Sequence, residues 1–469
     1  MSENIPYLHR SAYSPQNNIP IKLDQKSEIY KKIKSGNYKI AIYGLGHVGS
    51  PLASVWIRSG ASVIGTDKSQ KVLENARIGI TYIPEPGVNE AFYLGLNEKR
   101  FFIYEDPVKT SSDSFLKMIC VPVLAPDGSA DLSAVINVAI SIGKGLKKND
   151  VVSLNPSVPP GTTEEVIVPV LEKESGLKVE EDFYVIYNPE RIFVGRAIAD
   201  IEERYPGIVS GFGRKSLDVG TQLLSIIYKK GIIQMTKIKT AEAEKLFEGV
   251  YRDVNIALAN ELAKYSEKLG IDFWEIRNAA NSQPFCHIHQ PGIGVGGACI
   301  PVYPQFIINS ADKLGFDCVI TKLARKINNG MPKYCVEDAL KMISSIKPSN
   351  ELKITLLGLS FRGGVSDTRL SPTYDVINEL KKMNYTNIIV HDPLVKSDNY
   401  LENKLKIKLT SDFKIATENS DLLILITDHK EYLDLMGNNK KNTPLYDGRG
   451  LLKFNSYEFP IRILGKSYF

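Results

Sequence analysis

The segment 40–67, IAIYGLGHVGSPLASVWIRSGASVIGTD, decides how the chain begins to fold. The apolar run 40–43 predicts a buried strand, and the glycine pattern that follows it opens a helix. Gly44 permits a tight turn, Gly46 lets the backbone approach a pyrophosphate, and Gly49 lets the helix pack closely on the strand. The N–H groups at the start of the helix would hold the phosphates. The sequence therefore predicts a dinucleotide turn, with cofactor contacts from Gly44, Gly46, His47, Val48 and Gly49.

A second apolar run, 62–67, ends in Asp67, which lies 23 residues after Gly44. A carboxylate at this place would accept hydrogen bonds from the ribose hydroxyls of a dinucleotide. The same charge repels a 2′-phosphate, so the sequence favours NAD over NADP as the cofactor.

Short apolar runs then alternate with helical patterns, at 115–123, 150–156, 183–190 and 207–212. Strands that alternate with helices predict βαβ units and a mostly parallel sheet. A later block repeats this plan, with a strand from Lys353, a glycine turn, a helix at 372–383, a strand ending at Asp392, and apolar runs at 421–429 and 443–450. The glycines at 358–364 do not fit the dinucleotide pattern, so no second NAD site is expected there.

A long helix is predicted between the two blocks, because residues 241–268 hold no proline and only one glycine. Apolar residues recur at every fourth position from Leu246 to Leu262, which gives the helix an apolar face for core packing or for a dimer contact. The predicted fold class is α/β, with two Rossmann-like doubly wound domains joined by a long central helix and a helical middle domain. The expected divisions are an extension (1–36), an NAD-binding domain (37–235), a central helical dimerisation domain carrying a cysteine loop (236–335) and a C-terminal nucleotide-type α/β domain (345–469).

Composition excludes several classes of protein. The 469 residues carry a net charge of +5 without a dense basic run, so neither nucleic acid nor a membrane surface is an expected partner. No uncharged apolar stretch of about 18 residues is present, and the start of the chain does not resemble a secretory signal. Five widely spaced cysteines, an odd number, indicate a reducing, cytoplasmic compartment.

The loop 291–304, PGIGVGGACIPVYP, is rich in glycine and proline before Cys299. So flexible a segment is poor packing material, but it lets backbone close around a substrate and present a thiol. Cys299 is therefore interpreted as a nucleophile, with Lys245 as the cation that would stabilise its thiolate. Cys120 and Cys318 are expected to be buried structural cysteines. Cys286, His287 and His289 could begin a zinc site, but no second ligand pair follows at a suitable spacing, so no metal is predicted.

Eight motifs in this order resemble those of the UDP-glucose/GDP-mannose dehydrogenase family, and in particular its branch acting on UDP-N-acetylmannosamine or UDP-N-acetylglucosamine. The motifs are GLGHVG (44–49), CVPV (120–123), PSVPPGTT (156–163), NPER (188–191), EKLFEGVYRDVNIALANE (244–261), GVGGACIP (294–301), SFRGGVSDTRLSP (360–372) and YDGRG (446–450). The resemblance implies an NAD-dependent, four-electron oxidation of C6 of a UDP-N-acetylhexosamine to the acid, with UDP-N-acetylmannosamine favoured, for use in polysaccharide biosynthesis. It also implies a homodimer formed through the central helix, and a substrate held between the outer domains.

Roles follow from the resemblance by position. Cys299 would be the covalent nucleophile, Lys245 would stabilise the alkoxide and oxyanion, and Glu190 would activate the hydrolytic water. The hydroxyl of Ser157 would lie near C6, and Tyr303 would hydrogen-bond the water or the lysine. Further cofactor contacts are implied for Val121, Pro122, Ser157 and Arg369. Substrate contacts are implied for Arg191, Lys245, Arg252, Asn255, His287, Gly296, Arg362 and Arg449.

The chain departs from the family pattern at three of these places. Tyr303 stands where an aspartate is common, Gly249 where an asparagine is common, and Phe285 where the acetamido branch has an arginine. Two other classes of function therefore remain open. A two-electron, hydroxyacid-type dehydrogenase would need neither Cys299 nor the third block, and a non-catalytic NAD or nucleotide-sugar binding protein would tolerate the departures. UDP-N-acetylglucosamine and UDP-glucose are the alternative substrates.

Overall fold

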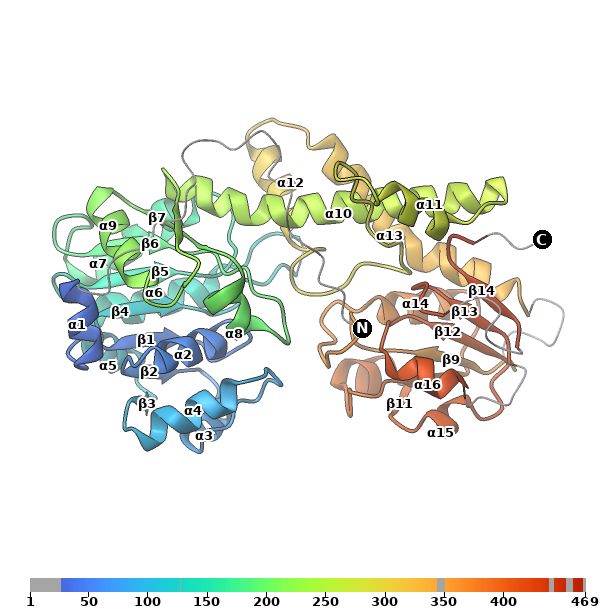
Figure 1. Ribbon diagram of the computed structural model, residues 1–469, viewed down its shortest axis with the longest axis horizontal. Coiled ribbons are helices and arrows are strands. Elements are labelled where there is room, and N and C mark those ends of the chain that lie inside the picture. Colours follow the sequence, from blue (N-terminus) through green and yellow to red (C-terminus); the bar gives the residue numbers. More distant parts are fainter. Residues whose placement is uncertain (1–26, 127, 344–350, 438–442, 453–458, 467–469) are drawn as a thin grey trace. The chain divides into compact units, whose positions relative to one another are not determined.

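The computed structural model describes residues 27–126, 128–343, 351–437, 443–452 and 459–466. These residues form two compact units, which are divided between Phe247 and Glu248 (Figure 1). Each unit is built around its own sheet. No helix in the described part of the chain is both long and apolar enough to cross a membrane.

The first unit holds an eight-stranded sheet in the order β3-β2-β1-β4-β5-β6-β7-β8. Every neighbouring pair is parallel except β6 and β7. The strands are β1 (Ile40–Tyr43), β2 (Val63–Thr66), β3 (Phe101–Ile103), β4 (Leu116–Ile119), β5 (Val151–Leu154), β6 (Tyr184–Tyr187), β7 (Gly207–Gly211) and β8 (Ile232–Gln234).

Both faces of this sheet are buried. Ile40 and Ile42 enter one apolar cluster, whereas the alternate residues Ala41 and Tyr43 enter another. Successive side chains of a strand point to opposite faces, so helices cover the sheet on both sides and the unit is doubly wound. The covering elements are α1 (Glu28–Lys34), α2 (Gly49–Arg58), α3 (Gln70–Arg77), α4 (Val88–Asn97), α5 (Pro107–Ser112), α6 (Ser133–Gly145), η1 (Thr163–Ile167), α7 (Val168–Ser175), α8 (Ala197–Ala199), η2 (Asp200–Arg204) and α9 (Arg214–Leu224).

The second unit has a six-stranded, all-parallel sheet in the order β11-β10-β9-β12-β13-β14. Counted within the unit, this is the order 3-2-1-4-5-6 of a dinucleotide fold. The strands are β9 (Ile354–Leu357), β10 (Ile388–His391), β11 (Lys408–Thr410), β12 (Leu422–Leu425), β13 (Leu445–Asp447) and β14 (Ile461–Ile463). Its helices are α11 (Phe273–Ala280), α12 (Tyr303–Lys313), α13 (Val319–Leu340), α14 (Pro372–Lys382), η3 (Tyr400–Lys404), α15 (Phe413–Thr417) and α16 (Glu431–Gly437).

The long helix α10 (Ile238–Leu269) begins in the first unit and continues into the second. The predicted apolar face is only partly buried, since Leu246 is fully enclosed but Leu258 is 47% exposed. Tyr251, Leu258 and Tyr265 follow one another at intervals of seven residues and all stand in solvent. A spacing of seven keeps side chains on one face of a helix. This exposed stripe, which shares Leu258 with the predicted apolar face, is named the α10 face (Tyr251, Leu258, Tyr265).

The sequence prediction of two Rossmann-like sheets with a long helix between them is confirmed. Four strands were not foreseen: β3, β8, β11 and β14. Each is only three residues long and lies at the edge of its sheet, so each offers too short a pattern to be recognised as a strand. Cys318 was expected to be buried, but it is half-exposed at the start of α13, and the buried structural thiols are Cys120 and Cys335.

Candidate active site

The glycine turn after β1 has the geometry that a dinucleotide turn needs. Gly44 has a φ of +95° and donates its N–H to the carbonyl of Thr66 at 2.8 Å. A Cβ on Gly49 would stand 1.8 Å from the carbonyl oxygen of Gly44, so the first residue of α2 must be glycine. Gly46 has no such neighbour, and its nearest contact would be the Tyr82 hydroxyl at 3.6 Å. The turn is therefore closed on the packing side and open on the ligand side.

Asp67 is held at the end of β2 by two backbone N–H groups. One oxygen accepts from Leu45 at 2.9 Å and the other from Ser69 at 2.9 Å. Each carboxylate oxygen can accept a second hydrogen bond, so both keep a lone pair for ribose hydroxyls.

A cavity of about 980 Å³ opens beside this turn. Its volume falls in the upper part of the range usual for small-molecule sites. Five of the predicted cofactor residues line it, namely Gly44, Gly46, Asp67, Val121 and Pro122. Tyr82 and Asn137 also line it, and neither was predicted, because they come from distant segments with no local pattern to mark them.

Replacing Gly49 with alanine is expected to weaken NAD binding at least tenfold, because the new methyl group would force the turn away from α2. A calorimetric titration with NAD measures this. Gly330→Ala is the matched control, since Gly330 lies within α13 with open space around it. That variant should keep its NAD affinity and gain about 0.5–1 kcal/mol of stability. Equal NAD affinity in the two variants would contradict the role of Gly49.

Glu190, beyond the end of β6, is buried in the first unit. Burial raises the pKa of its carboxyl to about 7, and the positive charge of Lys245 opposes that rise. The Tyr228 hydroxyl donates to one carboxylate oxygen at 3.2 Å, and the N–H of Arg191 donates to the other at 3.2 Å. The structure therefore brings Glu190, Arg191 and Lys245 together, and a carboxyl that titrates near neutral pH suits a general base.

The segment after Arg191 is fixed to the loop that follows α3. Both oxygens of buried Glu85 accept N–H groups from it, from Gly195 at 2.7 Å and from Ala197 at 2.7 Å. The Arg191 guanidinium donates to the carbonyl of Pro206 at 2.5 Å and lies 5.1 Å from the Tyr205 ring. Glu85 was not predicted, because nothing in its local sequence shows that it caps a distant loop.

In the second unit, the cysteine loop packs against the loop between β9 and α14. A Cβ on Gly296 would stand 2.6 Å from the carbonyl oxygen of Leu370, and Gly297 donates its N–H to the carbonyl of Arg369 at 3.0 Å. A Cβ on Gly292 would lie 2.7 Å from an Arg449 nitrogen. The expectation that this segment is poor packing material was wrong, because its glycines allow close backbone approach. Cys299, just beyond them, is exposed.

Gly249 and Tyr303, two of the three departures from the family pattern, contact each other. The Tyr303 ring lies against α10 so closely that a Cβ on Gly249 would stand 2.6 Å from it. Tyr303 is 9% exposed, is the first residue of α12, and donates its N–H to the carbonyl of Cys299 at 2.9 Å. The missing side chain at 249 thus makes room for the aromatic ring at 303. Phe285, the third departure, is 89% exposed.

The other predicted substrate residues of the second unit are spread over α10 and two loops. Asn255 holds the loop before Cys299 by accepting the N–H of His289 at 3.0 Å and donating to the carbonyl of His287 at 2.8 Å. Arg252 is exposed one turn earlier on α10. Among the described residues, no group of three metal-ligating side chains converges, and the His287 and His289 rings stand 5.3 Å apart.

Two Rossmann-like units, one with an open dinucleotide-type cavity, define a nucleotide-binding α/β architecture. Models of the UDP-glucose/GDP-mannose dehydrogenase family match in three parts, the NAD-binding domain at 38–231, the central domain at 239–330 and the UDP-binding domain at 355–454. The chain belongs to this family. It is an NAD-dependent nucleotide-sugar dehydrogenase, and its C-terminal domain binds the UDP part of the substrate.

Relatives support the same assignment. A UDP-N-acetyl-D-mannosamine dehydrogenase of Pyrococcus horikoshii is 31% identical over 435 residues, which are 91% of this chain and 99% of the relative. An NDP-N-acetyl-D-galactosaminuronic acid dehydrogenase of Ralstonia nicotianae is 28% identical over 418 residues, which are 88% of this chain and 96% of the relative. The solved structure of a UDP-glucose dehydrogenase from Pyrobaculum islandicum superposes with a TM-score of 0.83 at 25% identity, covering 92% of this chain and 98% of that one.

Proposed function

We propose that the protein oxidises C6 of UDP-N-acetylmannosamine to the carboxylic acid, with Cys299 as a covalent nucleophile. The observation that carries the proposal is the exposed thiol of Cys299 on a loop packed against the segment that bears Arg362 and Arg369. Two relatives of different organisms support an acetamido sugar, since one is named a UDP-N-acetyl-D-mannosamine dehydrogenase and the other an NDP-N-acetyl-D-galactosaminuronic acid dehydrogenase. UDP-N-acetylglucosamine and UDP-glucose are the alternatives.

The residues supply what the two oxidations require. NAD, when bound, accepts a hydride in each step. The Lys245 ammonium would stabilise the C6 oxygen while the water bound near Ser157 takes the proton of the C6 hydroxyl. Electrostatic stabilisation of this kind is usually the largest single contribution to such steps. The Cys299 thiolate would add to the aldehyde carbon and form a thiohemiacetal, which loses hydride to become a thioester. Glu190 would take a proton from water as the water attacks the thioester carbon, and the thiolate leaves.

Ser157 and Tyr303 complete the proposed catalytic set, with the Ser157 hydroxyl near C6 and its bound water. The substrate diphosphate and sugar would be held by Arg191, Arg252, Asn255, His287, Gly296, Arg362 and Arg449, with the cofactor also contacted by His47, Val48 and Arg369. The four divisions expected from the sequence, 1–36, 37–235, 236–335 and 345–469, are the proposed domain boundaries. All five cysteines are free thiols, which supports a reducing, cytoplasmic setting.

A panel of UDP-sugars with NAD tests the function, with NADH followed by absorbance and the product by mass. Two NADH per substrate and a product heavier by one oxygen and lighter by two hydrogens support the proposal. One NADH per substrate would instead support a two-electron dehydrogenase, and no turnover with any sugar would support a binding protein.

The α10 face supports a homodimer as the working assembly. Its three large side chains stand exposed at heptad spacing on a helix of 32 residues. Burying such a stripe against a second copy would remove apolar area from water at roughly 25 cal/mol per Å². Leu258→Glu is therefore expected to give a monomer by light scattering, whereas Leu433→Glu, at an exposed leucine of α16, should remain dimeric. A dimer in both variants would contradict the interface.

A further inference from the structure

The two units use the same place in the fold differently. Ligands of open α/β sheets bind outside the carboxyl ends of the strands, where the strand order reverses. In the second unit this point lies between β9 and β12, so its two flanking loops are 358–364 and 427–429. In the first unit the equivalent loops, after β1 and β4, both line the open cavity.

The second unit repeats the first unit's turn with one decisive change. Gly358, with a φ of +107°, corresponds to Gly44, and Asp392 at the end of β10 corresponds to Asp67. Ser360 takes the place of Gly46, the glycine that lets a pyrophosphate approach. Ser360 is 1% exposed and Asp392 is fully buried.

Asp392 has no capacity left for a ribose. One oxygen accepts the N–H groups of Leu359 at 2.7 Å and Ser360 at 3.0 Å, and the other accepts those of Leu394 at 2.8 Å and Val395 at 2.9 Å. Burial would raise the pKa of Asp392, but hydrogen bonds, that of His429 foremost, lower it below its usual range. The carboxylate therefore acts as a fixed anchor for the loop after β9.

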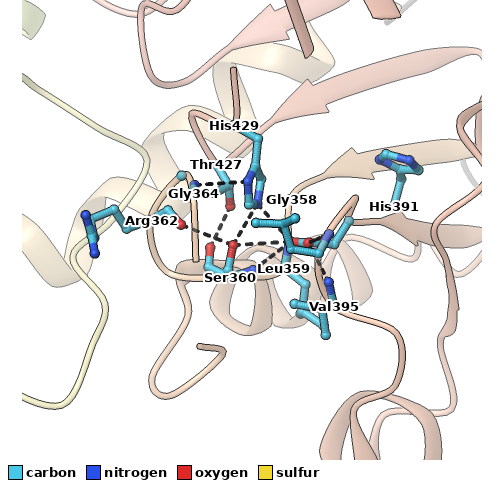
Figure 2. A network of polar contacts seen from close by, with 12 residues as sticks. Gly358, Leu359, Ser360, Arg362, Gly364, His391, Val395, Thr427 and His429 are labelled. Atoms are coloured by element: carbon cyan, nitrogen blue, oxygen red, sulfur yellow. Dashed lines mark hydrogen bonds and ion pairs between the residues drawn. The ribbon is translucent and has the colours of Figure 1, made fainter. Parts of the chain in front are cut away.

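His429, fully buried after β12, joins the two flanking loops (Figure 2). Its Nδ1 accepts the N–H of Gly364 at 3.2 Å, and an amide can only donate, so the proton of the neutral ring is assigned to Nε2. That nitrogen lies 2.8 Å from the Ser360 hydroxyl and 3.2 Å from Asp392 Oδ2. The imidazole thus contacts the 360–364 loop at both ends.

The loop so held carries Arg362. The Ser360 hydroxyl donates to the Arg362 carbonyl at 3.2 Å, and the arginine side chain extends away from the network in Figure 2. The neighbouring Asp428 accepts the Gly363 N–H at 2.9 Å and lies 3.5 Å from the Arg449 guanidinium. A Cβ on Gly363 would stand 2.2 Å from the Asp428 carbonyl oxygen, so the two loops are in backbone contact.

We propose that His429 is a positioning residue for UDP-sugar binding, because its imidazole ties the loop of Arg362 to the end of β12. The proposal rests on the proposed role of Arg362 as a substrate ligand. In the second unit the His429 bridge fills the place that a dinucleotide occupies in the first. Arg362 and Arg449 of this unit are then available to bind the diphosphate of a mononucleotide.

The test uses His429→Phe in the full chain, which keeps the ring volume but removes both ring nitrogens. The expected result is a rise of at least tenfold in the Kd for UDP, measured by calorimetry, with a matching rise in KM for the UDP-sugar. KM for NAD should change by less than about twofold, and one NAD should bind per chain. His429→Asn, whose amide oxygen can take the place of Nδ1, should recover part of the loss.

His391→Phe is the matched control. His391 is also buried at the end of a strand of the same sheet, but it contacts Tyr432 and Ser411 and not the 360–364 loop. It should lower Tm without raising the Kd for UDP. Equal rises in both variants, or no rise in His429→Phe, would overturn the proposal. Should His429→Phe fail to fold, Ser360→Ala removes the hydroxyl alone, and an unchanged Kd for UDP in that variant overturns the proposal equally.

UDP binding is measured without turnover, so the result does not depend on which sugar is oxidised. If the wild-type protein binds UDP but oxidises none of the UDP-sugars, the proposed function is wrong. The role of His429 in UDP binding is then still tested by the same titration.

Discussion

Replacing Cys299 with serine is expected to abolish formation of the acid, with a fall of at least about a thousandfold in turnover. A serine hydroxyl is scarcely ionised at neutral pH and would add to the aldehyde far more slowly than a thiolate. The cavity lined by Gly44, Gly46 and Asp67 belongs to the other unit, so NAD affinity should be unchanged. The measurements are the yield of acid by mass spectrometry and the Kd for NAD by calorimetry.

The matched control is Cys318→Ser. Cys318 is a half-exposed thiol at the start of α13 and has no place in the proposed chemistry. It should leave acid formation intact. Iodoacetamide should inactivate the wild type with the label on the peptide that contains Cys299, because that thiol is exposed. Acid formation at the wild-type rate by Cys299→Ser would remove the covalent mechanism.

Replacing Glu190 with glutamine is expected to slow hydrolysis of the thioester by a factor of about 100 to 10,000, the usual contribution of a general base. The amide keeps the size of the side chain but cannot take a proton from water. The acyl group should then accumulate on Cys299, visible as a mass increase of the intact protein, with a burst of NADH before the slow steady state. A variant that shows neither accumulation nor loss of rate would contradict this role.

The wild-type rate should also depend on pH through Glu190. Burial raises the pKa of this carboxyl to about 7, so the base is protonated and inactive below that pH. When hydrolysis limits turnover, kcat should rise with pH and level off above about 7. Because the folded pKa is raised, any stability contributed by the protonated carboxyl is full below the unfolded pKa and is lost as pH rises through 7.

Tyr228→Phe tests whether the pH dependence of kcat is set by Glu190. The Tyr228 hydroxyl donates to Glu190 and favours its charged form, which lowers the pKa of the carboxyl. Removing this hydrogen bond should move the acid limb of the profile to higher pH while the plateau rate stays near that of the wild type. An unmoved limb would mean that another group sets it.

The central parts of the fold were predictable because their signals are local. The strand, glycine turn and carboxylate from Ile40 to Asp67 are contiguous in the sequence. The turn requires glycine at 44 for its positive φ and at 49 for close packing. The helix over 241–268 was equally predictable. The absence of proline indicates its length, and the apolar residues at every fourth position indicate its helical period. Three-residue strands at the margins of the sheets carry too little sequence to show a period.

The supporting contacts of the site could not be predicted, for a physical reason. Glu85 reaches the N–H groups of Gly195 and Ala197 over about 110 residues of chain, and His429 reaches Ser360 over 69. The local sequence does not reveal either partner, because glutamate is mostly exposed in proteins and histidine is only intermediate in its burial. The packing role of the glycines at 292–297 was mispredicted for the same reason, since it depends on side chains and backbone that approach from distant parts of the sequence.

The contact between Gly249 and Tyr303 limits the order in which these two positions can change. Any side chain added at 249 while the ring is in place would overlap it, and shrinking residue 303 alone would leave a void beside the helix. Substitutions in direct contact are seldom additive. Changing this pair to the asparagine–aspartate pair one residue at a time is therefore expected to pass through a destabilised protein, whereas changing both residues together avoids that intermediate.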